Sequence, residues 1–113
     1  MTQTIDWQGK SGKMYRYWFL EKTTSDSIKA EGGNYNFVKQ LTNGKWTPLY
    51  FGESGDLQGR IPGHEVWAAA VRLGATHVMA HTTPAGERAR QAEEQDLIAF
   101  WNPPLNTQHR SVG

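Results

Sequence analysis

Hydrophobic residues in the first half of the chain fall in short stretches that predict β-strands. Three such stretches, rich in aromatic or alternating hydrophobic residues, lie at residues 14–20, 34–41 and 46–51. Asn43 and Gly44 separate the last two stretches and both tolerate positive φ, so these two strands are expected to form a hairpin. Pro48 lacks a backbone N–H donor, which predicts that the second hairpin strand is at a sheet edge or is distorted.

After residue 53 the hydrophobic spacing becomes that of helices. Ser54 can cap a short helix that carries Leu57, Arg60 and Ile61. A second helix is expected over residues 64–73, where hydrophobic residues and alanines lead to a glycine that can end it.

One more strand and one long helix complete the expected elements. The strand is predicted at residues 75–81. Thr83 is expected to cap the helix, with Pro84 at its first position, and the helix is expected to end near Trp101 before two consecutive prolines. This order predicts an α+β fold: a small antiparallel β-sheet, made of the hairpin, a third strand and an additional N-terminal strand, covered by α-helices.

The length of 113 residues suits one domain with one modest core. Residues 1–13 are polar and are predicted to be a flexible N-terminal arm, and residues 14–113 are predicted to form the domain. The formal net charge of +1 gives no general attraction to nucleic acid or membranes. The lack of cysteine excludes disulfides, thiolate catalysis and cysteine-bound zinc. With no signal peptide and no apolar stretch near the roughly 20 residues of a membrane span, a soluble cytoplasmic protein is expected.

Two adjacent glutamates on the last predicted helix are the first candidates for chemistry. Glu93 and Glu94 flank the apolar stripe that includes Leu97 and Ile98 almost symmetrically, so the helical pattern does not separate them. A carboxylate beside such a stripe points toward the protein body and needs a partner or a metal ion. The alternative is a surface acid at the edge of an amphipathic helix.

Tyrosines on the predicted strands are the second group of candidates. Tyr35 shares a strand face with Phe37, and Tyr50 faces a surface or groove if Phe51 packs inward. Cross-strand packing is the common role of such tyrosines. A tyrosine that acts as a base needs a cation nearby, because its free pKa is about 10. Arg60 alone is typical of a solvated charge, although its planar guanidinium suits a phosphate.

The histidines give weaker indications. His77 and His81 lie on one face of a predicted strand, roughly 13 Å apart, which is too far to share one ion easily. Structural or surface roles are therefore expected for both. His64 follows Arg60 by four residues, and Asn106 belongs to a stretch that ends the last helix and anchors the tail.

In chain order, these residues form a series of motifs that resembles the GIY-YIG nuclease family. The resemblance covers roughly residues 33–106, and its most specific part is the tyrosine-x-glycine block with a serine, a leucine and an arginine in helical register after it. The matching motifs are Gly33-Asn34-Tyr35, Tyr50-Phe51-Gly52, Ser54, Asp56-Leu57, Arg60-Ile61, Glu94 with Leu97-Ile98, and Asn102-Pro103-Pro104-Leu105-Asn106.

The resemblance implies a metal-dependent endonuclease that uses one divalent ion. Its register selects Glu94 rather than Glu93, because Leu97 and Ile98 then fall three and four residues after the acid. Glu94 would be the only protein ligand of Mg²⁺ or Mn²⁺, with water and phosphate oxygens in the other positions.

The other site residues take their implied roles from the same family. Arg60 would bind the scissile phosphate. Tyr50 or Tyr35 would help to activate the attacking water, and both remain open. His64 would contribute a proton or phosphate contact, and Asn106 would brace the site from the end of the chain.

The implied partner is nucleic acid, with DNA preferred over RNA, and no membrane is expected. Because residues 1–32 are the main extra segment, substrate recognition is expected to be weak or directed by nucleic-acid structure, or to depend on a protein partner or a homodimer.

Two other functions remain open. Glu53 directly follows Gly52 and adds a carboxylate beside the implied phosphate site. Together with the low net charge, it favours a catalytically inactive module of the same fold that binds nucleic acid or protein. The third hypothesis is a small structural or assembly protein built on packed aromatic residues such as Trp18, Trp46 and Trp67.

Overall fold

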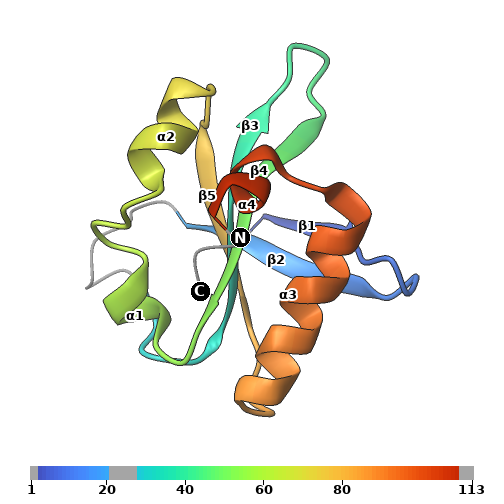
Figure 1. The fold of residues 1–113 in the computed structure, drawn as a ribbon, viewed down its shortest axis with the longest axis vertical. Helices are drawn as coiled ribbons and strands as arrows, with labels where there is room; N and C mark the ends of the chain where they lie inside the picture. Colours follow the sequence, from blue (N-terminus) through green and yellow to red (C-terminus); the bar gives the residue numbers. More distant parts are fainter. Residues whose placement is uncertain (1–2, 21–27, 110–113) are drawn as a thin grey trace.

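The computed structural model describes residues 3–20 and 28–109, so the predicted arm and domain are described except for residues 1–2, 21–27 and 110–113. These residues form an antiparallel β-sheet with helices on both faces, which confirms the α+β prediction (Figure 1). The strand order is β1-β2-β5-β3-β4. The strands are β1 (Thr4–Gln8), β2 (Met14–Leu20), β3 (Gly33–Gln40), β4 (Trp46–Ser54) and β5 (His77–Thr82). The helices are α1 (Leu57–Arg60), α2 (Trp67–Arg72), α3 (Glu87–Trp101) and α4 (Pro104–His109).

Strand β3 lies in the interior of the sheet and is buried on both faces. Tyr35 and Phe37 point to the face that α1 and α2 cover, and they pack there with Leu57 and Ile61. Val38 points to the opposite face, where α3 packs. The alternation of side chains along one strand therefore supplies two separate cores.

Strand β4 forms the edge of the sheet, as Pro48 predicts. Its pairing with β3 shifts between Phe37 and Val38, so Leu49 has no partner in the register and the strand bulges there. The turn between the two strands carries Gly44 with a φ of 82°, which agrees with the predicted hairpin.

The prediction of a flexible arm over residues 1–13 was wrong for the part that the structure describes. Residues 4–8 form β1, which pairs with β2 at the edge of the sheet opposite to β4. Trp7 is only 2% exposed and contacts the rings of Phe51 and Trp101. One large aromatic residue in a polar segment is enough to dock this strand on the core.

The predicted N-caps of two helices were also wrong. Asp56, not Ser54, is the N-cap residue of α1, because Ser54 ends β4 and its hydroxyl accepts a hydrogen bond from the Asp56 N–H in the turn. Helix α3 begins after Gly86, whose φ is 103°, and not at Thr83. The end of α3 at Trp101 agrees with the prediction.

Within the described residues, no helix is both long enough and apolar enough to cross a membrane.

Candidate functional site

Two tyrosines meet on the α1–α2 face because of the pairing of β3 with β4. Tyr35 pairs with Gly52, and Phe37 pairs with Tyr50, so the two tyrosines are diagonal neighbours on one face. Their ring centroids are 6.3 Å apart. A Cβ atom at Gly52 would lie 2.4 Å from Cζ of Tyr35. The glycine of the second motif is therefore required because the ring of the first tyrosine lies directly over it.

His64 is hydrogen-bonded to the hydroxyl of Tyr35 from the interior of the protein. Its side chain is buried, and its Nε2 lies 2.7 Å from the Tyr35 hydroxyl. The N–H of Val66 donates to Nδ1 of His64 at 3.0 Å. Because Nδ1 accepts this bond, it carries no proton, and its 3.6 Å approach to Glu65 is not an ion pair. His64 is thus a neutral imidazole that donates from Nε2 to Tyr35.

The hydroxyl of Tyr35 in turn donates to Tyr50. Burial raises the pKa of both tyrosines, and the hydrogen bond between them raises the pKa of Tyr35 but lowers that of Tyr50. Because the Tyr35 hydroxyl accepts a hydrogen bond from Nε2 of His64, its own proton is left for the bond to Tyr50. Tyr35 is 1% exposed, whereas Tyr50 is only partly buried. The hydrogen bonds therefore run outward from His64 through Tyr35 to Tyr50, and Tyr50 has the exposed position.

Arg60 comes from α1, which is anchored by two buried residues. Leu57 and Ile61 pack into the core on the α1–α2 face and leave Arg60 partly exposed. Its guanidinium makes two hydrogen bonds to the carboxylate of Glu65, of 2.7 and 2.8 Å. These bonds lower the pKa of Glu65 to about 2. Arg60 is therefore paired with an acid of its own chain, which the sequence did not predict.

Glu94 lies on α3 and is partly buried. Burial and, to a smaller extent, the nearby charge of Glu53 raise its pKa to about 7. Among the described residues, no lysine, arginine or histidine lies within ion-pairing distance of Glu94. The folded protein therefore disfavours the ionised form of this carboxylate.

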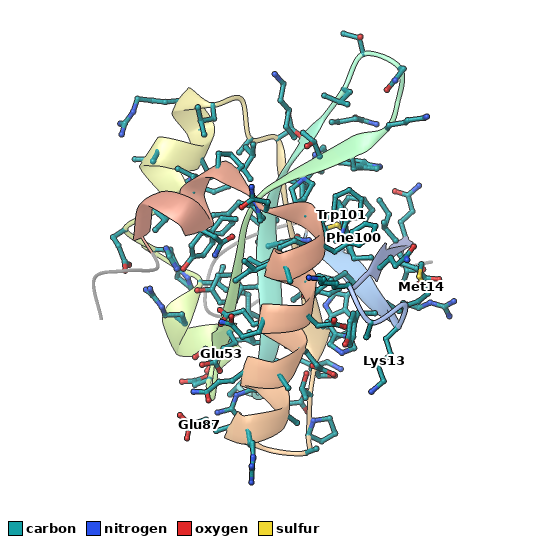
Figure 2. All side chains as sticks on the ribbon, turned by 45° about the vertical axis from the view of Figure 1, so that its right-hand side comes forward. Lys13, Met14, Glu53, Glu87, Phe100 and Trp101 are labelled. Atoms are coloured by element: carbon teal, nitrogen blue, oxygen red, sulfur yellow. The ribbon has the colours of Figure 1, made fainter. Side chains whose placement is uncertain are left out.

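The carboxylate of Glu53 forms an ion pair with an arginine of α3, the helix that also carries Glu94. Nε of Arg90 lies 3.1 Å from Oε2 of Glu53, and the two side chains are only 15% and 19% exposed. Figure 2 shows Glu53 beside α3, on the other side of this helix from Lys13 and Met14. Arg90 precedes Glu94 by one helical turn, so the ion pair also places Glu53 close to Glu94.

Glu93 points elsewhere and resolves the ambiguity between the two glutamates. Its Oε1 accepts hydrogen bonds from Nδ2 of Asn34, at 2.9 Å, and from the hydroxyl of Thr83. Nε2 of His81 lies 3.7 Å from the same oxygen. Glu93 thus binds polar groups on the α3 face of the sheet, whereas the charge of Glu94 also acts on Tyr35 and Tyr50.

Asn106 supports the second tyrosine motif through the backbone. Its side-chain oxygen accepts from the N–H of Phe51, and its amide donates to the carbonyl of Phe51, both at 2.8 Å. These two bonds satisfy the backbone of an edge strand, as a neighbouring strand would. Asn106 therefore fixes the segment between Tyr50 and Gly52 and acts on the site through that segment.

Tyr35 and Tyr50 are both influenced by the charges of Glu94 and Arg60. The charge of Glu94 raises the pKa of Tyr35 and of Tyr50, and the charge of Arg60 lowers the pKa of both. Arg60 and Glu94 therefore both lie within electrostatic range of the two tyrosines, whose rings are neighbours on β3 and β4. His64 and Asn106 support these residues through hydrogen bonds: His64 is bonded to Tyr35 of β3, and Asn106 to the backbone of Phe51 in β4. The catalytic roles of all six remain predictions.

The other two histidines of the predicted strand are outside the site. His81 stacks on Tyr17 with ring centroids 5.5 Å apart, and its Nδ1 donates to the carbonyl of Arg16. His77 packs edge-on against Trp46 and Phe19. Both have structural contacts on the α3 face, as expected.

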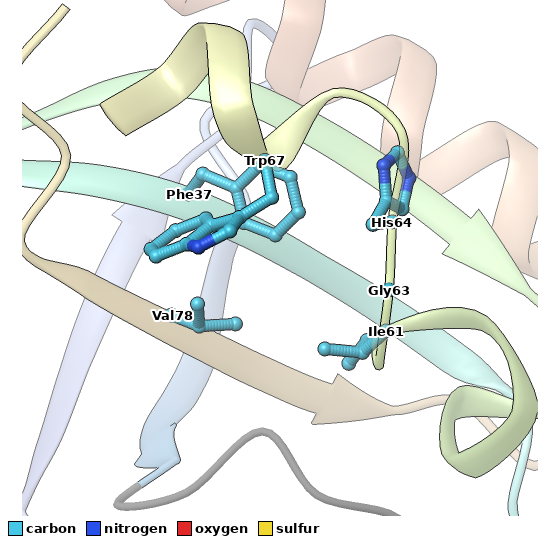
Figure 3. A pocket seen from close by; sticks show the side chains of 6 residues that line it. All are labelled: Phe37, Ile61, Gly63, His64, Trp67 and Val78. Atoms are coloured by element: carbon cyan, nitrogen blue, oxygen red, sulfur yellow. The ribbon is translucent and has the colours of Figure 1, made fainter. Parts of the chain in front are cut away.

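A small pocket next to His64 is too small for a substrate. It lies on the α1–α2 side and has a volume of about 30 Å³ (Figure 3). Its lining residues are Phe37, Ile61, Gly63, His64, Trp67 and Val78. This volume accommodates about two water molecules.

The sequence analysis did not identify two charged residues around the site, Glu65 and Arg90. Glu65 is separated from Arg60 by Pro62 and Gly63, which break any helical periodicity, so no pattern connects the two. Arg90 precedes Glu94 by four residues, and this spacing was a usable signal for a charge on the same helix face. Glu53 was seen in the sequence, but its partner was not.

The donor set at Glu94 fits a hard divalent cation. A partly buried carboxylate with no cationic partner in the described part of the chain supplies oxygen ligands of the type that Mg²⁺ and Mn²⁺ prefer. The described residues contain no group of three or more histidine, aspartate or glutamate side chains that could hold a metal ion. An ion at Glu94 would therefore take most of its ligands from water or substrate.

Comparisons with known proteins returned no match to any protein-family model, curated protein or solved structure. The resemblance to the GIY-YIG family thus depends on the motif residues alone.

Proposed function

We propose that the chain is a metal-dependent endonuclease that hydrolyses phosphodiester bonds, with DNA as the preferred substrate. The observation that carries this proposal is the grouping of Tyr35, Tyr50, Arg60 and Glu94, which come from four different elements and share one electrostatic environment. A guanidinium, a carboxylate without a cationic partner and a polarised hydroxyl are the groups that phosphodiester hydrolysis requires.

The geometry favours Tyr50 as the tyrosine that contacts the attacking water. Tyr35 is buried and its hydroxyl is held between His64 and Tyr50. Tyr50 accepts from Tyr35, so its own proton is free to point toward the solvent side. Tyr35 and His64 would be positioning residues that fix the orientation of the Tyr50 hydroxyl.

The remaining residues divide the work of binding and charge stabilisation. Arg60 would bind a non-bridging oxygen of the scissile phosphate. Glu94 would hold Mg²⁺ or Mn²⁺, which when bound stabilises the charge that grows on the phosphate and the leaving oxygen. Asn106 would keep the Tyr50 segment in place. A cytoplasmic location and recognition through a protein partner or homodimer belong to the same proposal.

A cleavage assay tests the proposal directly. Supercoiled DNA, branched DNA and RNA would be incubated with the wild type and with Glu94→Ala, in Mg²⁺, in Mn²⁺ and in chelator. Metal-dependent cutting that is lost in Glu94→Ala is the expected result. Glu93→Ala is the matched control, because this neighbouring acid binds Asn34 and Thr83 instead. Equal inactivity of all proteins would overturn the proposal.

The second candidate is a catalytically inactive module that binds nucleic acid or protein. It is favoured by the pairing of Arg60 with Glu65, which occupies the guanidinium that a phosphate would need. This candidate predicts salt-sensitive binding of nucleic acid without cleavage in any metal. Turnover that disappears in Glu94→Ala would exclude it.

A further inference from the structure

Arg60 presents a flat pair of donors to Glu65. Its two terminal nitrogens bond separate oxygens of one carboxylate, at 2.7 and 2.8 Å, in the parallel two-bond arrangement. The same arrangement joins a guanidinium to two oxygens of a phosphate. A carboxylate and a phosphodiester therefore compete for the same edge of Arg60.

We propose that Glu65 occupies the phosphate-binding edge of Arg60 and that a substrate phosphodiester must displace it. Glu65 is then a specificity-determining residue of the site, and it lowers the affinity for nucleic acid. The inference rests on the proposed function for the identity of the competing ligand, and on the observed two-bond pair for the competition itself.

The displacement needs only a rotation of the Glu65 side chain. Glu65 is 68% exposed, so its carboxylate leaves Arg60 for water without losing a buried environment. The residues on either side are fixed: His64 is bonded to Tyr35, and the N–H of Val66 is bonded to His64. Arg60 itself is held by α1 and is 36% exposed. The backbone and Arg60 can thus stay in place while the acid swings out.

This arrangement selects ligands by their charge. A single weak anion gains little at Arg60, because it must first displace a carboxylate that makes two bonds. A polymer of phosphates brings further contacts at the same time, and these offset the loss of the Glu65 pair. The site is therefore expected to discriminate against small anions and in favour of oligonucleotides.

The test measures oligonucleotide binding with cleavage removed. A fluorescein-labelled 20-nucleotide DNA would be titrated with Glu94→Ala protein and with the Glu94→Ala, Glu65→Gln double variant. Removal of the acid is expected to tighten binding about two- to fivefold, the upper part of the range of one exposed ion pair. The gain in affinity is expected to disappear when Arg60→Gln is added, because the guanidinium for which Glu65 and the DNA compete is then absent.

Asp6→Asn is the matched control. It breaks another exposed pair of an acid with an arginine: Asp6, on the strand at the opposite edge of the sheet, lies 3.0 Å from Nε of Arg16. This change removes the same charge but is expected to leave affinity within twofold of the parent. Equal gains in Asp6→Asn and Glu65→Gln would show a general charge effect and would overturn the proposal.

The NMR signal of the Arg60 side-chain Nε–H separates this proposal from the proposed function. A shift of this signal on addition of the DNA, larger in Glu65→Gln than in the parent, supports the competition even if no variant ever cuts nucleic acid. Cleavage by the wild type with no effect of Glu65→Gln on DNA affinity would overturn the competition and leave the nuclease proposal intact.

Discussion

At the scale of single residues, Glu94 is the group with the clearest physical signature. Burial and the neighbouring charge of Glu53 raise its pKa to about 7, whereas the unfolded chain has the ordinary glutamate value. The folded state therefore holds a proton that the unfolded state releases at lower pH. This difference makes the stability of the protein depend on pH in a defined window.

We expect the free energy of unfolding to fall as the pH rises from about 4.5 to about 7, because ionised Glu94 is disfavoured in the folded state. Glu94→Gln removes this dependence, and the variant is expected to be more stable than the wild type at pH 8 and not at pH 4.5. Urea unfolding of both proteins at these two pH values measures the effect. A parallel pH dependence of the two proteins would contradict the assignment.

A metal ion is expected to compete with the proton for the carboxylate of Glu94. An ion at Glu94 favours the carboxylate, so any metal-dependent activity should rise with pH through the neutral range. Glu65 does not contribute to this rise, because its pKa of about 2 keeps it ionised throughout.

At the scale of elements, the site depends on a close approach between β3 and β4. The ring of Tyr35 lies over Gly52, and no side chain fits between them. The strand pairing thus explains why a glycine follows Tyr50 by two residues. The glycine is needed for packing even if the site has no catalytic activity.

Gly52→Ala is expected to lower the free energy of unfolding by about 2–3 kcal/mol, because the added Cβ forces the buried Tyr35 ring to move. Gly59→Ala in α1 is the matched control: its Cβ meets only the exposed carboxylate of Asp56, and alanine favours the helix. Chemical denaturation of both variants checks the prediction. A smaller loss in Gly52→Ala than in Gly59→Ala would contradict the packing.

The pair of Arg90 and Glu53 links two elements that carry site residues. It joins α3, which carries Glu94, to the end of β4, which carries Tyr50. The pair is largely buried, and Arg90 compensates the negative charge of Glu53, which would otherwise repel a phosphate. The negative charge of Glu53 is thus compensated by its ion pair with Arg90.

At the scale of the whole molecule, the N-terminal hairpin of β1 and β2 completes the core under α3. Trp7 packs between Phe51 and Trp101, and Nε1 of Trp101 donates to the carbonyl of Gln8. Asp96 of α3 accepts bonds from Ser11 and from the hydroxyl of Tyr15. The hairpin therefore holds the C-terminal half of the helix whose middle carries Glu94.

Trp7→Ala is expected to lower the free energy of unfolding by about 3–5 kcal/mol, because it removes a buried aromatic side chain and leaves a cavity against α3. Met14→Ala is the control, since Met14 is 56% exposed on the adjacent strand and its loss is expected to cost less than about 0.5 kcal/mol. Thermal and urea unfolding measure both. Equal, small effects would restore the interpretation of this segment as a loose arm.

The sequence by itself determined the features that depend on local chemistry. Asn43 and Gly44 specify the hairpin turn, Pro48 predicts the edge strand, and the prolines after Trp101 end α3. These residues act through their own backbone preferences, which need no distant partner. The α+β class follows from their order.

Only the tertiary structure decided what each polar side chain contacts. Glu93 and Glu94 are equivalent on a helical wheel, and they differ because Asn34 and Thr83 lie below one of them. The partners of Arg60 and Glu53, and the docking of Trp7, likewise depend on segments that lie apart in the sequence or behind a break in its periodicity. Burial and charge pairing are properties of the assembled surfaces, and a periodic pattern along one segment does not contain them.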